Sequence, residues 1–290
     1  MSYRSVFHSD LFRNRTVLVT GGGSGIGRCT AHELASLGAA LALLGRKVDK
    51  LEAVRDEIAV AFPGAKVTCH ACDIREEDRV RETVTAVLQQ HGRIDGLFNN
   101  AGGQFPSPLK DISLKGWETV VKNNLTGGFL MARECYTQWM EQNGGAIVNV
   151  IADMWNGMPG MGHSGAARAG MLNFTETAAC EWAQAGVRVN AVAPGWIASS
   201  GFDTYPLEFQ ALTKKLKRKV PLQRFGTESE VSAAVVFLLS EAAAFITGTC
   251  LRVDGGVPNA RHTWALVPHQ RSQAYNGFPL YQPPYWMAEE

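Results

Sequence analysis

The amino-acid sequence predicts an α/β fold whose centre is a doubly wound parallel sheet. Short apolar runs alternate with longer segments of helical spacing along most of the chain. The apolar runs are continuous and do not alternate with polar residues, which is typical of strands buried on both faces. A glycine-rich stretch follows the first run directly and opens the first helical segment. Runs of this kind, each followed by a helix, favour a parallel sheet with helices on both faces.

The strands and helices can be placed in chain order. The apolar runs predict strands at 16–20, 39–45, 66–73, 96–102, 146–151, 187–195 and 248–256. Helical spacing predicts helices at 26–38, 47–62 and about 76–91, and the first of these stops at a glycine. If the segment 162–170 is also a helix, Ser164 and Arg168 lie on one of its faces.

Composition and charge exclude several classes of protein. The formal net charge of +1 argues against a nucleic-acid or membrane-surface binder, which would need a basic face. No apolar run reaches the roughly 18–20 residues of a membrane span. The N-terminal segment is polar and lacks the apolar stretch of a secretory signal, so we expect a cytoplasmic protein.

The cysteines indicate a role in core packing and not in metal binding or redox catalysis. Of six cysteines only Cys69 and Cys72 form a C-x-x-C pair, and no second pair follows at the spacing of a zinc site. We interpret "KVTCHACDI" as a buried strand that runs into a turn, and we expect no metal.

The stretch "VLVTGGGSGIGR" predicts a dinucleotide-binding loop. Glycines without a Cβ let the backbone approach a pyrophosphate, and the following helix N-terminus offers free N–H groups and a favourable dipole. Because the motif lies between a strand and a helix, it favours a dinucleotide-binding loop over a plain tight turn. Its candidate cofactor-binding residues are Gly21, Gly23, Ser24, Gly25, Ile26 and Gly27.

The end of the second strand indicates which dinucleotide is bound. An NAD site usually has a carboxylate there for the ribose hydroxyls. Here Gly45 takes that place and Arg46 and Lys47 follow. A guanidinium pairs well with a 2′-phosphate, so we expect NADP (NADPH), with a solvated surface charge as the alternative interpretation of Arg46.

The chain length favours one large domain over two. We predict a dinucleotide-binding reductase domain over residues 1–256. Residues 257–290 are rich in proline and aromatic residues and show no helical period. We interpret them as an extended C-terminal tail packed on a surface.

Taken together, the motifs resemble the short-chain dehydrogenase/reductase family. They are "TGGGSGIG" (20–27), "CDI" (72–74), "NNAG" (99–102), "NNLTG" (123–127), "VRVNAVAPG" (187–195) and "ITGTCLRVDGG" (246–256). The resemblance implies a seven-stranded parallel sheet and assembly as a homotetramer or homodimer. It also implies that Asp73, Ile74, Asn100, Ala101 and Gly102 border the adenosine, that Pro194, Gly195 and Ile197 line the nicotinamide, and that Asn124 is the family's active-site asparagine.

The chain departs from this family at its catalytic centre. The family pattern is Tyr-x-x-x-Lys with a serine about a dozen residues earlier. In this register Ser164 stands in the place of the tyrosine and Arg168 in that of the lysine, and the upstream serine falls at Ile151 or Ala152. Between Gln138 and Asp203 there is neither tyrosine nor lysine.

A narrower resemblance fits this departure. "NNAGGQFPSPLKDISLKGWETVVKNNLTGGF" (99–129) and "HSGAARAGMLNFT" (163–175) are similar to the peroxisomal trans-2-enoyl-CoA reductases and their 2,4-dienoyl-CoA reductase relatives. That branch also lacks the usual tyrosine. The chain is also similar to bacterial dehydrogenases of citronellol and other acyclic terpenoid breakdown.

The residue types at these two positions determine which reactions the site can catalyse. A serine has no useful proton affinity near neutral pH and an arginine keeps its proton, so the pair is poorly suited to alcohol oxidation. Reduction of a conjugated enoyl thioester needs hydrogen-bond donors to the thioester oxygen. Ser164 can donate one such bond, and Arg168 can hold the nicotinamide ribose and add a positive field. Other interpretations are a helix N-cap for Ser164 and a buried salt bridge for Arg168. Asp153, His163 and Tyr205 are candidate acids for the α carbon.

Three loops would surround the substrate at the carboxyl ends of the strands. They carry an apolar lining suited to an acyl or prenyl chain, with a subunit interface as the alternative. Its members are Phe105, Met154, Trp155, Met158, Met161, Trp196, Phe202 and Tyr205. A further hypothesis is that the tail, with Tyr275, Tyr281 and Tyr285, reaches over a site and restores an acid.

We therefore expect an NADPH-dependent reductase of an α,β-unsaturated acyl thioester, with a small-molecule substrate that is an acyl-CoA. One alternative is a dehydrogenase of an acyclic terpenoid alcohol or aldehyde. The other is a catalytically silent NADPH-binding protein.

Overall fold

The structure is a computed structural model that describes residues 2–199, 215–260 and 266–287. Its centre is a seven-stranded sheet in the order β3-β2-β1-β4-β5-β6-β7, in which every neighbouring pair is parallel. This is the doubly wound sheet that the sequence predicts. The strands are β1 (Thr16–Thr20), β2 (Ala40–Gly45), β3 (Val67–Ala71), β4 (Gly96–Asn99), β5 (Gly145–Val150), β6 (Val187–Pro194) and β7 (Cys250–Val253).

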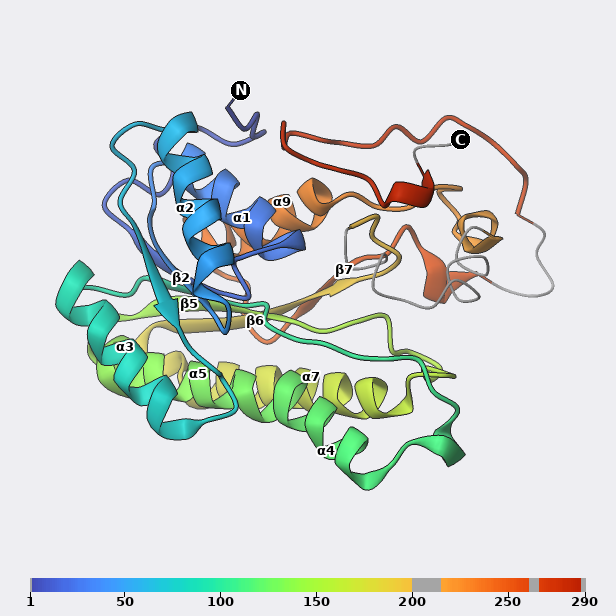
Figure 1. Ribbon diagram of the computed structural model, residues 1–290, viewed down its shortest axis with the longest axis horizontal. Helices are drawn as coiled ribbons and strands as arrows, with labels where there is room; N and C mark the ends of the chain where they lie inside the picture. The colour runs from blue at the N-terminus through green and yellow to red at the C-terminus, as the bar shows by residue number, and fades with distance from the viewer. Residues whose placement is uncertain (1, 200–214, 261–265, 288–290) are drawn as a thin grey trace.

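Helices cover both faces of the sheet (Figure 1). On one face lie α1 (Gly25–Ser36), α2 (Val48–Ala61) and α9 (Glu228–Leu239). On the other lie α3 (Glu77–His91), α4 (Leu114–Val121), α5 (Gly127–Cys135) and α7 (Gly162–Glu181), and the short α6 (Glu141–Asn143) precedes β5. Each layer buries its own apolar cluster: Leu34, Ile58 and Val235 pack on one side of the sheet, Val84 and Met131 on the other.

Two π-helical turns join α4, α5 and α6 into one irregular helical run. The first spans Lys122–Thr126 and contains Asn124, and the second spans Tyr136–Met140. Such turns occur often at functional sites, because the extra residue shifts a side chain out of its α-helical position. The sequence motif "NNLTG" falls on the first of them.

One expectation about burial is wrong. The sequence predicts a buried strand at 66–73, but Cys69 and its neighbours in β3 are only partly buried. The reason is topological: β3 is the outermost strand and lacks a neighbour on one side. Cys69 and Cys72 carry free thiols.

The described part of the tail has little regular structure, as expected. It holds two short 3₁₀ turns, at Val257–Asn259 and Tyr285–Met287. Residues 266–287 run back along the α1 and α9 side of the molecule (Figure 1). There Phe278 is buried against Tyr3 and Cys29. The domain boundary at residue 256 stays a prediction.

No helix in the described ranges has the length and apolar character that crossing a membrane requires.

Candidate active site

The glycine-rich loop opens a cavity of about 410 Å³ at the carboxyl ends of β1, β2 and β4. Most of the predicted cofactor residues line it: Gly21, Gly23, Ser24, Ile26, Arg46, Lys47, Asp73, Ile74, Asn100, Ala101 and Gly102. They come from segments far apart in the sequence, which the parallel strands bring to one edge of the sheet. This edge is where doubly wound folds bind their ligands.

The glycines of this loop are needed for close backbone packing. A Cβ on Gly27 would lie 2.3 Å from the carbonyl oxygen of Gly21 and 2.6 Å from the Asn100 side chain. Gly21 and Gly25 have φ values of +66° and +57°, which residues with a Cβ rarely adopt. Ser24 precedes α1 without capping it through its side chain. The first turn of α1 therefore points N–H groups toward the cavity, as an anionic dinucleotide requires.

Three cations lie at one end of the cavity. Arg46 and Lys47 follow β2 and are exposed, and Lys50 lines the cavity from the first turn of α2. Asp73 lies nearby, but both of its carboxylate oxygens accept hydrogen bonds from the Arg75 side chain, at 2.8 and 2.5 Å. This pairing lowers the pKa of Asp73, with Arg46 contributing. The cavity thus presents positive charge next to a carboxylate that is already neutralised.

The loop Gly102–Gln104, after β4, is where the three candidate catalytic residues meet. Asn124 holds its backbone on both sides: the Asn124 amide donates to the carbonyl of Gly103 at 3.0 Å and its oxygen accepts from the Gly103 N–H at 2.9 Å. A Cβ on Gly102 would lie 2.5 Å from the Arg168 guanidinium and 2.7 Å from the Asn124 oxygen. Asn124 therefore positions the loop with its own side chain, in keeping with its place in a π-helical turn.

Ser164 is fully buried, and its hydroxyl donates to Oε1 of Gln104 at 2.5 Å. The helix begins at Gly162 with Met161 at its N-cap, so Ser164 is inside the first turn. The interpretation of Ser164 as the N-cap is wrong, because the chain enters the helix three residues earlier. The side chain instead faces the loop after β4.

Arg168 lies one turn further along α7 and is 9% exposed. It donates to the carbonyl of Val150 at the end of β5, while its Nε has no hydrogen-bond acceptor. Within the described ranges no carboxylate pairs with it, so the interpretation as a buried salt bridge is wrong. Burial lowers the pKa of Arg168 to about 10, which leaves the guanidinium charged near neutral pH. The result is a buried cation that no anion among the described residues balances.

The candidate acids differ in their surroundings. Burial, reinforced by Asp254, raises the pKa of Asp153. His163 is fully buried: its Nδ1 accepts the backbone N–H of Ser164, and its Nε2 has no hydrogen-bond partner among the described residues. Tyr205, like Phe202, lies outside the described residues.

The apolar loop residues are divided between the cleft and the core. Phe105 is 40% exposed, and its ring meets His163 edge-on. Met154 and Trp155 pack onto a small cluster with Ile151 and Met171, and Met161 is buried. Met158 and Trp196 are partly buried.

The predicted nicotinamide residues lie beside the cavity and not on its wall. Pro194 ends β6, and a Cβ on Gly195 would lie 2.7 Å from the Cα of Asp254, so only glycine fits there. Ile197 is buried and bridges to Gly226. Ser199, two residues on, lines the cavity.

Sequence reasoning missed several residues. Lys50, Asn123 and Ser199 line the cavity, Arg75 holds Asp73, and Gln104 accepts from Ser164. The missed signal for Lys50 is helical spacing, since it falls one turn after Arg46. Gln104 lies in a loop, where spacing predicts no contact. Across the described residues, no three His, Cys, Asp or Glu side chains gather in a way that would hold a metal.

Comparison with known proteins agrees with this geometry. A family model described as enoyl-(acyl carrier protein) reductase matches residues 21–258. A probable 2,4-dienoyl-CoA reductase of Bacillus subtilis is 36% identical over 245 residues, covering 83% of this chain and 96% of that protein. A peroxisomal 2,4-dienoyl-CoA reductase of Danio rerio is 34% identical over 257 residues, covering 88% of this chain and 85% of that protein.

Solved structures show the same fold. A citronellol catabolism dehydrogenase of Pseudomonas aeruginosa PAO1 superposes with a TM-score of 0.79 at 58% identity, covering 88% of this chain and 99% of that chain. The expected resemblance to dienoyl-CoA reductases and to citronellol dehydrogenases is confirmed. With the family match spanning nearly all of the sheet, the chain belongs to the short-chain dehydrogenase/reductase family of oxidoreductases, which use nicotinamide cofactors.

Proposed function

We propose that this oxidoreductase transfers a hydride from NADPH to an α,β-unsaturated acyl thioester, in the manner of an enoyl-CoA reductase. One observation carries the proposal. At the two positions where the family places its catalytic tyrosine and lysine, the chain has Ser164 and Arg168, both buried and both unable to accept a proton near neutral pH. The dienoyl-CoA reductases among the relatives support the substrate class.

Alcohol oxidation would need a base that these positions lack. The family solves that step with a phenol whose pKa is lowered by a neighbouring lysine. Neither a serine hydroxyl nor a charged guanidinium can take the proton of an alcohol. Reduction of an enoyl thioester makes a different demand, because negative charge develops on the thioester oxygen and only donors are needed there.

The donor to that oxygen is best supplied by Ser164 and Gln104 as a pair. The Ser164 hydroxyl is committed to Oε1 of Gln104, and Ser164 has no exposed surface. This bond fixes the Gln104 amide plane and with it the direction of the Nε2 protons. Gln104 is partly exposed and belongs to the loop that Asn124 clamps. In this arrangement Gln104 Nε2 donates to the substrate oxygen and Ser164 orients the amide.

Arg168 adds a fixed positive charge beneath the same loop. Because no carboxylate of the described residues balances it, its field acts on whatever charge develops above Gly102. Such a charge needs no reorganisation when the enolate forms. The guanidinium also lies where it can hold a hydroxyl of the nicotinamide ribose.

The last proton goes to the α carbon. Asp153 is the better candidate of the two described acids, because burial raises the pKa of its carboxyl and favours the protonated form. Water is the alternative source.

The residues that line the cavity have the chemistry that NADPH binding requires. The glycine loop and the start of α1 would hold the pyrophosphate, and Arg46, Lys47 and Lys50 would hold the 2′-phosphate. When bound, the dinucleotide supplies the hydride; the protein residues bind and orient it. Ile74, Asn100 and Ala101 form the wall for the adenosine.

A dehydrogenase of an acyclic terpenoid alcohol or aldehyde is the second candidate. The observation in its favour is the 58% identity to the citronellol catabolism dehydrogenase. An aldehyde also develops negative charge on oxygen when it accepts hydride, so the reductive direction is compatible with a site made of donors.

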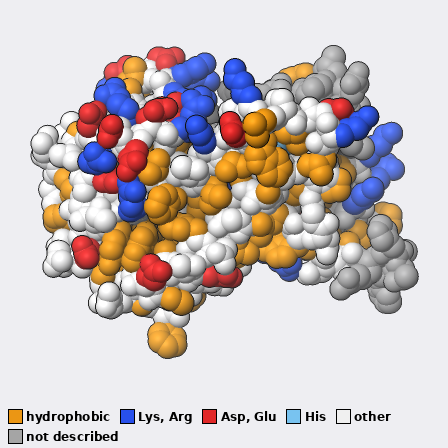
Figure 2. All heavy atoms as spheres, turned by 90° about the horizontal axis from the view of Figure 1, so that it is seen from below, with side chains coloured by type: hydrophobic (Ala, Val, Ile, Leu, Met, Phe, Trp, Pro, Cys, Tyr) orange, Lys and Arg blue, Asp and Glu red, His pale blue; other side chains and the backbone are white. Residues whose placement is uncertain are grey.

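We also propose that the enzyme is a cytoplasmic homodimer or homotetramer. Figure 2 shows apolar side chains gathered on the face formed by α3, α4, α5 and α7. Exposed apolar residues there include Leu114 of α4, 73% exposed, and Phe129 of α5, 37% exposed. Exposed apolar area of this kind often marks a subunit interface.

The test follows NADPH oxidation with crotonyl-CoA, a longer 2-enoyl-CoA and citronellal, each also with NADH. We expect turnover with the two thioesters. Oxidation with citronellal alone would support the second candidate. Tight NADPH binding without turnover of any substrate would indicate a catalytically silent protein and contradict both.

A further inference from the structure

A second and larger cavity, of about 810 Å³, lies between the loop after β6, the N-terminus of α9 and the C-terminal tail. One wall consists of Ala198, Lys217, Arg218 and the stretch from Gln223 to Thr227. The other consists of tail residues, among them His269, Asn276, Tyr281 and Met287. Its volume is within the usual range of small-ligand sites.

This tail wall is anchored at several points. The Arg224 guanidinium forms a two-pronged ion pair with Glu230, donates from Nε to the hydroxyl of Ser272, and lies against the tail backbone. The Glu230 carboxylate in turn accepts the backbone N–H of Tyr275, and the hydroxyl of Thr227 donates to the carbonyl of that residue. The tail is thus built into the cavity and does not merely lie across it.

A second set of anchors holds the tail to the N-terminal segment. The Tyr275 hydroxyl donates to the carbonyl of Arg4 at 2.6 Å, and the N–H of Arg4 donates to the carbonyl of Gly277 at 2.8 Å. Phe278 is 2% exposed, and the Arg28 guanidinium lies 5.1 Å from its ring centre. The family match ends at residue 258, so the tail wall lies outside the part of the chain that the family model describes.

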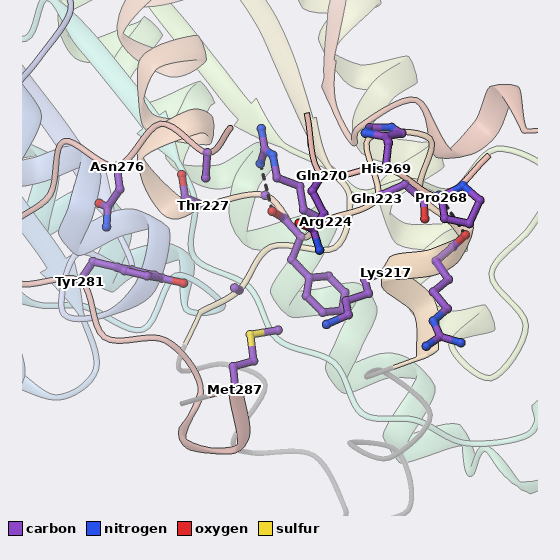
Figure 3. A pocket seen from close by; sticks show the side chains of 15 residues that line it. Lys217, Gln223, Arg224, Thr227, Pro268, His269, Gln270, Asn276, Tyr281 and Met287 are labelled. Atoms are coloured by element: carbon purple, nitrogen blue, oxygen red, sulfur yellow. Dashed lines mark hydrogen bonds between the residues drawn. The ribbon is translucent and has the colours of Figure 1, made fainter. Parts of the chain in front are cut away.

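The cavity is positively charged at one end. Lys215, Lys217, Arg218 and Lys219 place four cations within five residues. Arg218 and Lys219 take part in no ion pair with the described residues. The charge of Arg224 is neutralised by Glu230, so Arg224 anchors the tail and does not add to the positive charge of the cavity. Figure 3 shows the Lys217 and Tyr281 side chains extending into the cavity from opposite sides.

The rest of the lining is apolar or hydrogen-bonding. Phe225, Pro268, Met287 and two alanines supply apolar surface, while Gln270, Asn276 and Thr227 supply polar groups. Burial, with a contribution from Glu228, raises the pKa of Tyr281 to about 12, so its hydroxyl stays a donor. Basic groups at one end beside aromatic and apolar surface match a ligand that carries phosphates and a ring or an amide arm.

Consecutive residues after β6 line the two cavities. Ala198 lines the larger cavity, and the next residue, Ser199, lines the cofactor cavity. A molecule reacting at the nicotinamide end can therefore extend across this loop into the larger cavity. A free short acid or aldehyde would not reach it, but a thioester with a long phosphorylated carrier would.

From these observations we propose that the tail and the basic segment Lys215–Lys219 form a binding site for the phosphate-bearing carrier of the acyl thioester, which we take to be coenzyme A. The site rests on the proposed function, since it names the carrier of that substrate. In this arrangement Lys217 and Arg218 bind carrier phosphates, and Tyr281 and Asn276 contact the uncharged arm.

The experiment compares crotonyl-CoA with crotonyl-N-acetylcysteamine, which has the same acyl group and thioester but no phosphates. The double variant Lys217→Gln, Arg218→Gln should raise KM for crotonyl-CoA tenfold or more and leave KM and kcat for the short thioester unchanged. The matched control is Lys66→Gln, Arg79→Gln, which removes the same charge from exposed positions at the far end of β3 and on α3. It should behave as the parent.

A binding measurement keeps the two proposals apart. Free coenzyme A is titrated by calorimetry into the NADPH-saturated protein, and the double variant should bind it at least tenfold more weakly than the parent. If neither thioester is turned over, the proposed function fails, while the titration still tests the site. If both thioesters are turned over with equal KM in the parent, or the double variant keeps the parent's preference and affinity for coenzyme A, the site is contradicted and the reductase function stands.

Discussion

Among single residues, Arg168 has the least usual surroundings. A buried cation without a partner costs several kcal/mol, because its hydration is lost and no nearby anion replaces it. In the part of the chain that the structure describes, the guanidinium donates to the Val150 carbonyl and lies beside Gly102. A site that stabilises developing negative charge has this character before the substrate arrives, and the cost is offset when the anion forms.

Arg46 is the residue that we propose to be responsible for the preference for NADPH over NADH. Its exposed guanidinium lines the cavity and forms no ion pair with any described residue. We predict that Arg46→Gln weakens NADPH binding by about 10- to 100-fold, the value of one charge-assisted hydrogen bond, and leaves NADH binding nearly unchanged. Fluorescence titration with both dinucleotides measures this.

The control for that change is Arg55→Gln, which neutralises a partly buried arginine of α2 that does not line the cavity. If Arg46→Gln weakened the binding of NADPH and NADH equally, this side chain would not bind the 2′-phosphate.

The sequence predicts most of this residue-scale picture but not its connections. Spacing identifies Ser164 and Arg168 as neighbours on one helix face, and the structure places both there. Spacing cannot show that the Ser164 hydroxyl donates to Gln104, because that contact joins the first turn of α7 to a loop residue 60 positions earlier. Nor can it show that Arg168 lacks a carboxylate, which depends on the packing of α7 against β5.

The elements themselves follow the sequence closely where their pattern is regular. Every predicted strand is present, because continuous apolar runs bounded by glycine have few other stable arrangements in a sheet buried on both faces. The π-helical turn at Lys122–Thr126 is not predictable in this way. Its side chains have mixed polarity, and its geometry depends on the hydrogen bonds of Asn124 to Gly103.

The first turn of α9 contains a titratable group, Glu228, that makes the stability of the fold depend on pH. Glu228 is 5% exposed, and burial raises its pKa to about 7 although Arg28 opposes the shift. Because the folded state holds this proton more tightly than the unfolded state, the contribution to stability is fully present below about pH 4.3. It is lost as the pH rises through about 7.

We predict that Glu228→Gln removes this pH dependence. The variant should gain up to about 3 kcal/mol relative to the parent between pH 5 and pH 8, since the amide carries no charge that burial penalises. Denaturant unfolding at a series of pH values measures the difference. A constant difference between the two proteins over that range would contradict the assigned shift.

At the scale of the whole molecule, the tail ties the two chain ends to α1 and α9. Its composition predicts an extended surface segment, and the described residues agree. Composition does not predict the partners, because Phe278, Tyr275 and their contacts with Tyr3 and Arg4 join opposite ends of the chain. Such long-range pairing depends on the completed fold.

We predict that Phe278→Ala lowers the free energy of unfolding by about 3 kcal/mol, as expected for a buried aromatic ring, and exposes the tail to limited proteolysis. Thermal unfolding and a trypsin time course measure both. Val267→Ala, at a position that is 77% exposed, is the control. If the Phe278→Ala variant unfolded at the same temperature as the parent and trypsin cleaved both at the same rate, the tail would not be anchored as described.

The most direct test of the central claim, that this site stabilises a negative oxygen by donation, is the rate of crotonyl-CoA reduction by Ser164→Ala and Arg168→Met. The thermal unfolding temperature serves as the check that each variant is folded. We predict that kcat falls about 100-fold in each variant, because Ser164→Ala releases the Gln104 donor from its orientation and Arg168→Met removes a fixed charge, and that Arg168→Lys recovers part of the loss. Turnover by both variants as fast as the parent, or rapid oxidation of simple secondary alcohols by the parent with NADP, would contradict the claim.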